Sequence, residues 1–501
     1  KKAARIGAEI LAIILVFLLL FVGLVLWKLR SAPIDISFVK PAILKTVNSE
    51  DSPYQVDFSH IVIAWPELEG SLKLRALDMQ LKSGAQEVFS ISKADLFLDM
   101  RAMIRGKLAI DEVVLYSPRA HILREADNSF SIDIASDKEP VKTAPDAQQE
   151  PDTNFASDII ETLLKPEEDA LKADDKLGYL DRFEIREAEI IISDKVSNMT
   201  WFLPQIDLAL TRWDKGINAQ AAINLSPYSS EDHNKVNLDV TYERDNEQLE
   251  AKINLEKFDV AILSRYIKEL KPFRKHEAKI NGRFIATFNK DLTLDNAVID
   301  VNIPEIGINL PQEFQHKKTI NNIILSGFFD NKERNYQLDL RSLEVDDTKL
   351  NGKISGTFQG MDYQATAKLE APQIDLNFFK NNWPSSLKSE SASVWLTEKL
   401  SKGQFHNIKG QVALAHNFDS GATTVTDPRL DFSFDNVHIN YRAPMLPVDN
   451  AEGHGFIDEN GLEIFVDSGM VADLKLSEGD VKLKNIYETG KGIADIKLKL
   501  A

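Results

Sequence analysis

Hydrophobic and polar residues alternate with a period of two over most of the C-terminal two thirds of the chain. One run, for example, separates Val236, Leu238 and Val240 by Asn237 and Asp239. Successive side chains of a β-strand point to opposite faces of its sheet, so this pattern predicts strands with one apolar face and one face in water. Clusters of turn-forming residues separate the runs, which favours antiparallel pairing of neighbouring strands.

The runs predict roughly 18–20 strands after residue 177. A twisted sheet of that many strands rarely stays flat, so we expect it to curl with its apolar side inward. We predict a mainly β fold, in which an N-terminal transmembrane helix precedes a long, curled, mostly antiparallel β-sheet that forms an elongated apolar groove. A few short helices are expected, at residues 38–49, 258–271 and 386–402. The alternation alone does not decide whether the apolar side is an open groove or a closed core.

If the groove is open, its inward apolar positions are the candidate ligand contacts. The alternation places the following residues on that side: Val236, Leu238, Val240, Leu249, Ile253, Leu255, Ile280, Phe284, Phe288, Leu338, Leu340, Ile354, Phe358, Leu430, Phe432, Phe434, Val437, Ile439, Leu462, Ile464, Val466, Ile496 and Leu498. A groove that holds acyl chains requires apolar side chains at these positions and no residue of a particular identity.

Residues 10–27 form an 18-residue stretch without a charged residue, and basic residues flank it on both sides. As a helix it would extend ~27 Å, close to the ~30 Å thickness of a bilayer's hydrocarbon core. A cleaved signal peptide is the alternative, but its apolar segment is usually only ~7–15 residues long. We therefore predict an uncleaved, single-pass anchor with the bulk of the chain exported. Its representative positions are Ile10, Leu15, Leu20, Leu26 and Trp27.

The composition divides the chain into four parts. Residues 1–30 are the predicted anchor, and residues 31–134 a membrane-proximal β region. Residues 135–176 hold 12 Asp and Glu residues against 5 Lys residues, with four prolines, which predicts a flexible acidic insertion that could include one short helix. Residues 177–501 form the extended β region, and its last alternating run ends without a turn, so we expect the sheet to continue beyond Ala501.

Composition and motifs also exclude several classes of function. The net charge of −18 argues against a nucleic-acid partner, because binding phosphates requires a basic surface. The absence of cysteine excludes disulfides and thiolate metal sites. The nine histidines are scattered without metal-ligand spacing, and no nucleophile elbow, P-loop or dinucleotide fingerprint is present. We therefore predict no catalytic residue, no metal site and no cofactor. The segment 346–347 is interpreted as a turn, and the segment 453–455 as either a turn or a strand that needs close backbone approach.

The N-terminal third contains a series of motifs in a fixed order. Residues 94–96 and 105–113 lead into Leu-Tyr-Ser-Pro at 115–118 and Ile-Leu-Arg-Glu-Ala-Asp-Asn-Ser at 122–129. This order resembles the N-terminal pattern of the AsmA-like superfamily, the relatives of AsmA, TamB and YhdP. In that pattern, a "G-x-L-x-I" step introduces a "P-x-x-x-L-x-R" strand shortly after a transmembrane anchor.

Motifs in the C-terminal part resemble the YhdP-type subfamily and its associated domain. They are Trp-Pro at 383–384, residues 394–396 and 400–403, residues 441–447, and Glu-Gly-His-Gly-Phe at 452–456. The acidic insertion departs from the family pattern.

The resemblance implies a protein of the Gram-negative inner membrane that projects a curled β-sheet into the periplasm and moves phospholipid toward the outer membrane. It implies no catalytic residues. The alternative hypothesis is an anchored periplasmic scaffold that contacts outer-membrane or other envelope proteins. A third hypothesis, an anchored hydrolase, requires a clustered polar pocket that the sequence does not indicate.

Overall fold

The computed structural model places most of the chain in β-strands that belong to two compact units, residues 1–251 and residues 252–501. The structure describes residues 32–41, 54–65, 72–83, 86–105, 109–124, 130–133, 179–195, 199–227, 234–259, 277–291, 293–308, 318–346, 348–360, 362–382, 398–417, 421–440, 444–484 and 493–500, together with isolated positions at 20, 23, 24, 27–29, 44, 48 and 261.

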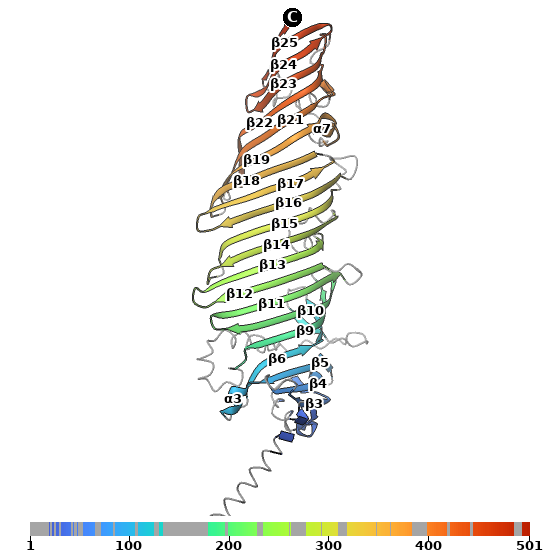
Figure 1. Cartoon of the computed structure of the whole chain (residues 1–501), viewed down its shortest axis with the longest axis vertical. Coiled ribbons are helices and arrows are strands. Elements are labelled where there is room, and N and C mark those ends of the chain that lie inside the picture. The colour runs from blue at the N-terminus through green and yellow to red at the C-terminus, as the bar shows by residue number, and fades with distance from the viewer. Residues whose placement is uncertain are drawn as a thin grey trace, which may run out of the picture. The chain divides into compact units, whose positions relative to one another are not determined.

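The first unit is a sheet of short strands followed by longer ones (Figure 1). Its elements are β1 (Ile34–Asp35), the 3-10 helix η1 (Ser37–Val39), β2 (Tyr54–Asp57), β3 (His60–Ala64), β4 (Leu72–Ser83), β5 (Gln86–Leu98), α3 (Met100–Ile104), β6 (Ile110–Tyr116), β7 (Arg119–Arg124), β8 (Phe130–Asp133), β9 (Arg182–Asp194), β10 (Met199–Trp213), β11 (Gly216–Pro227) and β12 (Asn234–Glu243). β13 (Gln248–Asp259) carries the chain from the first unit into the second.

Pairing in the first unit is antiparallel except where the chain returns after residue 179. There β9 runs parallel to both β6 and β7. β9 then begins a series of antiparallel neighbours with β10, β11 and β12.

The register of the first unit separates apolar from polar side chains. One row of directly paired residues runs across seven strands and consists of Leu74, Leu96, Val113, Phe183, Leu210, Ala219 and Val240. The row one residue further along each strand has mostly polar members: Arg75, Asp95, Val114, Glu184, Ala209, Gln220 and Asp239. Neighbouring residues face opposite sides of a sheet, so each face of this unit has its own chemistry.

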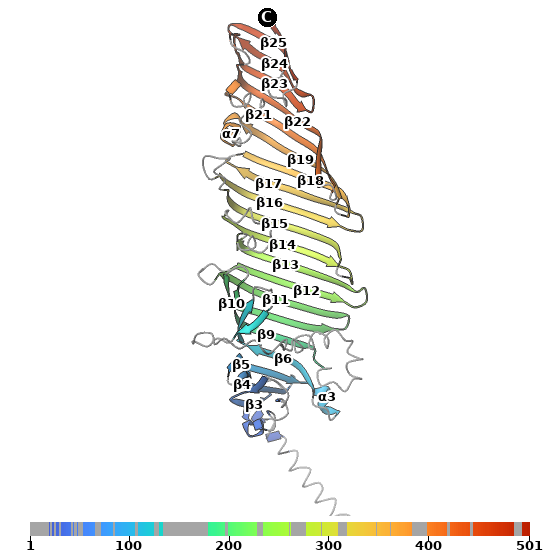
Figure 2. The same ribbon diagram turned by 180° about the vertical axis from the view of Figure 1, so that it is seen from behind.

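The second unit is an antiparallel sheet whose strands follow one another in chain order, as both ribbon views show (Figures 1 and 2). Its elements are β14 (Glu277–Phe288), β15 (Leu294–Ile308), β16 (Lys318–Asp330), β17 (Asn335–Val345), β18 (Thr348–Gln359), β19 (Asp362–Asp375), α7 (Leu376–Asn382), β20 (Leu400–Ser401), β21 (Gln404–Asn417), β22 (Ala422–Ile439), β23 (Val448–Asp458), β24 (Gly461–Val471), β25 (Leu474–Lys484) and β26 (Ile493–Leu500). β19 pairs with β21, and the short β20 pairs with the end of β22.

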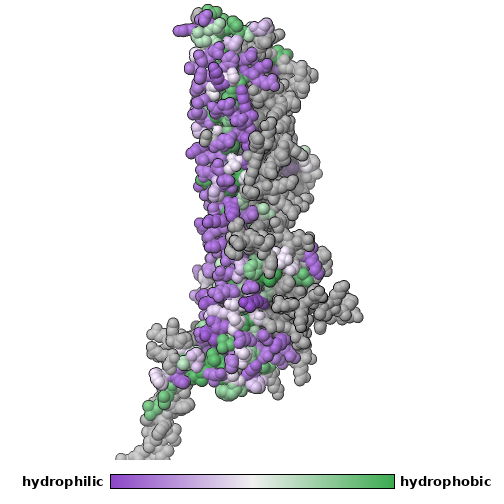
Figure 3. Space-filling model, turned by 90° about the vertical axis from the view of Figure 1, so that its right-hand side faces the viewer, coloured by the Kyte–Doolittle hydropathy of each residue, from purple (hydrophilic) through white to green (hydrophobic). Residues whose placement is uncertain are grey.

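A central apolar row crosses eleven strands of the second unit. Its directly paired members are Gly282, Val301, Leu325, Leu340, Gly352, Leu369, Gly410, Leu430, Ile457, Leu462 and Leu483. One residue away, the row on the opposite face is polar throughout: Arg283, Asp300, Ser326, Asp339, Lys353, Lys368, Gln411 and Arg429. Hydrophilic side chains also predominate along the strands on the side shown in Figure 3.

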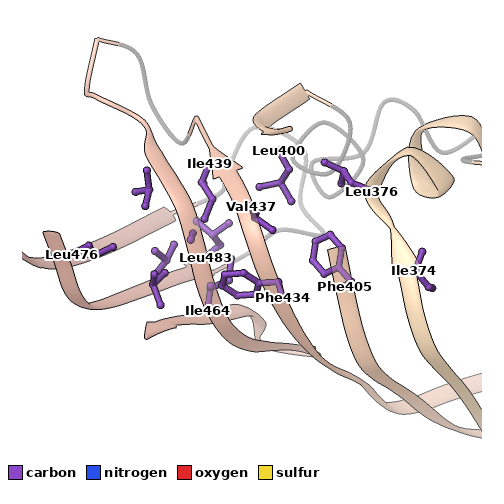
Figure 4. Packing of buried hydrophobic residues seen from close by; sticks show 14 of the residues in the cluster. Ile374, Leu376, Leu400, Phe405, Phe434, Val437, Ile439, Ile464, Leu476 and Leu483 are labelled. Atoms are coloured by element: carbon purple, nitrogen blue, oxygen red, sulfur yellow. The ribbon is translucent and has the colours of Figure 1, made fainter. Parts of the chain in front are cut away.

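The last strands of the second unit enclose a closed hydrophobic core. Its buried members come from β19, α7 and the strands from β20 to β25, and they include Leu376, Leu400, Phe405, Phe434 and Val437. In Figure 4, the side chains of Leu376 and Leu400 lie beside those of Phe405 and Val437. A helix and a two-residue strand thus cover the apolar face at this end of the unit.

The mainly β fold predicted from the alternation is confirmed, and the described residues after position 177 contain 18 strands, β9 to β26. The helix predictions are partly wrong. Phe258 continues β13 because the alternating pattern extends to it, and Leu400 pairs as a strand with Ile439. The short helix α3 begins at Met100 because the Asp99 side chain caps it by accepting from the N–H of Ala102.

Other predictions fall mainly outside the described residues. These are the acidic insertion at 135–176, most of the predicted helices at 258–271 and 386–402, and most of the anchor at 10–27. Leu20 and Trp27 are described as helical, whereas Ile10, Leu15 and Leu26 are not described. Among the described residues, no helix combines the length and apolar character needed to cross a bilayer.

Candidate binding groove

A groove of about 540 Å³ lies over the central strands of the second unit, a size in the range of ~300–1,000 Å³ common for small-molecule sites. Its floor combines the central row with a second apolar row two residues further along each strand. The second row consists of Phe284, Ile299, Gly327, Leu338, Ile354, Ala367 and Val412. From the two rows, the groove is lined by Leu325, Leu338, Leu340, Gly352, Ile354, Ala367, Leu369, Gly410, Val412, Leu430 and Ile457. Lys353, Lys368, Gln411, Pro428 and Arg429 complete the lining.

Two glycines in the central row help to keep the groove hollow. A Cβ atom at Gly410 would lie 3.5 Å from Leu430 Cδ1, and one at Gly352 would lie 3.2 Å from the backbone oxygen of Lys368. Neither glycine has a side chain that could fill the groove. Leu369 pairs with both of them and lies between them on the groove floor. The floor therefore alternates leucines with gaps.

The apolar face is open over the groove strands and closed further along the unit. Among the described residues of β16, β17 and β18, no hydrophobic side chain is buried. Ile354 is 37% exposed and Leu369 is 44% exposed, although both lie on the apolar face. In β22 to β25, by contrast, each strand contributes at least two buried hydrophobic residues. The apolar face is therefore open over β16 to β18 and is packed as a core in β22 to β25.

At the hairpin end of the same strands, the aliphatic lining becomes aromatic. A second hollow of about 920 Å³ is lined by Thr293, Leu294, Phe329, Asn331, Tyr336, Phe358, Gly360 and Tyr363. The rings of Phe329 and Phe358 stack with their centroids 4.7 Å apart, and Tyr363 stacks on His416 at 5.2 Å. Burial, with a smaller contribution from the charge of Tyr363, raises the pKa of Tyr336.

The aromatic hollow is on the same face as the groove. Tyr336 and Leu338 are two residues apart in β17, as are Phe329 and Gly327 in β16, so their side chains share a face. Tyr363 is six residues from Leu369 in β19, a separation of ~20 Å along an extended strand.

The structure brings only part of the predicted set into these two sites. Leu338, Leu340, Ile354 and Leu430 line the groove, and Phe358 lines the aromatic hollow. Nine others belong to the closed core or pack against it: Phe432, Phe434, Val437, Ile439, Leu462, Ile464, Val466, Ile496 and Leu498.

The remaining predicted positions lie outside the two hollows. Phe284 belongs to the second apolar row, Phe288 pairs with Leu294, and Ile280 packs against the small cluster of Ala278 and Ile306. In the first unit, three residues of β12 pair with apolar residues of β11: Val236 with Ile223, Leu238 with Ala221 and Val240 with Ala219. Leu249, Ile253 and Leu255 are half-buried in β13.

Sequence reasoning missed Leu325, Leu369, Tyr336 and Tyr363. Tyr336 stands between Asn335 and Gln337, so the period-two pattern could have included it. Leu325 follows Ile323 and Ile324, and this continuous apolar run does not indicate a face. Leu369 stands between Lys368 and Glu370, so the alternation of apolar and polar residues could have identified it as well.

The described residues show no group of three or more histidines, aspartates or glutamates that could hold a metal ion. The main buried charges lie instead in the first unit. Asp95, with no exposed surface, accepts from Arg75 at 2.6 and 2.8 Å, and Lys73 lies 3.5 Å away. Burial opposes ionisation of Asp95, but the hydrogen bonds from Arg75 and the nearby cations hold its pKa below the usual value.

Comparisons of the chain with protein-family models, with curated proteins and with solved structures find no match.

Proposed function

We propose that the protein carries phospholipid between the inner and outer membranes of a Gram-negative envelope, as a non-enzymatic member of the AsmA-like superfamily anchored by residues 10–27. The observation that carries the proposal is the open groove of β16 to β22, with its unbroken apolar floor and its polar opposite face. A curled sheet would present such a floor to acyl chains and its charged side to water.

The energetics favour this kind of carrier. Exposing acyl chains to water costs ~0.8 kcal/mol for each CH₂ group, so a chain of about 16 carbons costs ~12 kcal/mol. A groove lowers that barrier by replacing water around the chain, without any chemical step. The apolar row of the first unit, with Leu74, Val113 and Phe183 among its members, offers the same kind of surface.

The test is to purify the full chain under mild conditions and identify extracted lipids by mass spectrometry. We expect co-purified phospholipid in the wild type and a severalfold loss in Leu369→Glu, because the substitution places a carboxylate on the groove floor. Thr366→Glu is the matched control, since it adds the same carboxylate to the same strand on the opposite face, beside Ser355 and Ala413, and it should retain lipid.

A protein that co-purifies with envelope proteins and holds no lipid would support the scaffold hypothesis instead. Equal lipid loss in the two variants would show that charge, and not the apolar floor, governs binding.

A further inference from the structure

We propose that the aromatic hollow holds the headgroup end of a phospholipid whose chains lie in the groove, and that it favours a headgroup carrying an ammonium group. This inference rests on the proposed function and adds an orientation and a headgroup class to it.

The first argument is the change of chemistry along the strands. From Leu369 to Tyr363, the groove face of β19 passes from an aliphatic floor to an aromatic side chain with a polar hydroxyl. Tyrosine rings suit a boundary where one end of a site is apolar and the other is wet. The ~20 Å between these two positions is comparable with the ~15 Å that one leaflet contributes to a bilayer's hydrocarbon core. A bound lipid would therefore place its chains over the leucines and its polar end among the rings.

The second argument is the absence of a phosphate-binding cation from the hollow. None of its eight lining residues carries a charge, and four are aromatic: Phe329, Tyr336, Phe358 and Tyr363. Aromatic rings attract an ammonium group through their negative faces, and aromatic cages for quaternary ammonium ligands use this attraction. A purely anionic headgroup would find no such partner in the lining.

The third argument is the charge at the adjoining hairpin ends. Within two residues of the lining positions lie five carboxylates and two cations. The carboxylates belong to Asp291, Asp295, Asp330, Glu333 and Asp362, and the cations to Lys332 and Arg334. Hydrogen bonds from the side chain and the backbone of Thr293 hold the pKa of Asp291 below its usual value, which keeps this carboxylate negative. The acidic surplus complements an ammonium group.

The aromatic hollow also has free space beside Gly360. Gly360 adopts a φ of +63°, and a Cβ atom added there would meet nothing within 4 Å. The turn between β18 and β19 thus leaves space beside Tyr363 for a headgroup to reach the rings.

The experiment uses the full chain and vesicles that contain equal amounts of phosphatidylethanolamine and phosphatidylglycerol with identical acyl chains. After incubation and re-isolation of the protein, mass spectrometry gives the ratio of the two bound lipids. We expect the ethanolamine lipid to be enriched about fivefold, consistent with one or two partly desolvated cation–π contacts. Tyr363→Leu, which keeps an apolar side chain but removes the ring, should bring the ratio close to one.

Two controls keep the result interpretable. Tyr363→Phe retains the ring and should retain the enrichment. Phe328→Leu removes a ring one residue from Phe329, on the opposite face of the sheet, and should retain it too. If wild-type protein binds both lipids in the vesicle ratio, or favours the glycerol lipid, the headgroup inference is overturned while the proposed function stands. If the wild type binds neither lipid, the proposed function fails and this inference fails with it.

Discussion

The ring of Phe434 lies directly over Gly453, its register partner on the neighbouring strand. A Cβ atom added at Gly453 would lie 2.9 Å from Cζ of Phe434 and 2.0 Å from the backbone oxygen of Phe465. Gly455 stands in the same relation to Phe432, with a separation of 2.9 Å. The closed core of the last strands therefore depends on glycines that let aromatic rings pack flat against the sheet.

Gly453→Ala should destabilise the second unit by about 1–3 kcal/mol, because the added methyl group overlaps both a ring and a backbone atom. Gly410→Ala is the matched control. A Cβ atom there meets Leu430 only at 3.5 Å, an ordinary contact, so the change should be nearly neutral. Urea unfolding followed by circular dichroism measures both. Equal stability of the two variants would contradict the account of the core.

The ion pair of Asp95 and Arg75 gives a prediction about the first unit. The folded-state pKa of Asp95 is below its unfolded value of about 3.9, so the stabilisation is present above roughly pH 4 and is lost as the pH falls through the folded pKa. Asp95→Asn should cost on the order of 3 kcal/mol at neutral pH, since Arg75 loses its buried counter-charge. The variant should also show a weaker loss of stability below pH 4.

The exposed pair of Arg429 and Asp431 provides the comparison for that measurement. Both of its side chains are nearly half exposed, and the Nη2 and Oδ1 atoms lie 2.7 Å apart. Solvent screens such pairs, so Asp431→Asn should change the unfolding free energy by less than about 1 kcal/mol. A loss at Asp431 as large as that at Asp95 would show that burial is not the source of the effect.

The strands and their faces could be predicted from the sequence because the side-chain period of a strand is two. Leu338 and Leu340 are separated by Asp339, and the register places Asp339 on the opposite face as the alternation requires. Of the two interpretations of the Gly-His-Gly segment, a turn or a strand with close backbone approach, the structure confirms the strand.

The division between groove and core could not be predicted in this way. Leu340 in the groove and Ile464 in the core carry the same local signal, an apolar residue in an alternating run. What separates them is coverage by distant segments. Leu376 on the short helix α7 and Leu400 on β20 close the core, and neither segment has a pattern long enough to indicate its place.

The predicted anchor leads to a fractionation experiment. Deleting residues 1–30 should release the protein from the membrane fraction of a Gram-negative host, because 18 consecutive uncharged residues are removed. The same residues fused to a reporter that is active only in the periplasm should give an active, membrane-bound product. A processed reporter recovered in the soluble periplasm would support the alternative of a cleaved signal peptide.

Charge substitutions on the apolar face should separate its closed end from its open middle. Val437 is 1% exposed within the core, so Val437→Glu buries a carboxylate without a partner, and we expect a loss of several kcal/mol that unfolds the last strands. Leu369 is 44% exposed, so Leu369→Glu should leave the unfolding transition within about 1 kcal/mol of the wild type. Thermal unfolding of the two variants measures this difference without any lipid. If Leu369→Glu unfolds the protein as readily as Val437→Glu does, the face over β19 is part of a packed core, and the groove loses its support as a binding site.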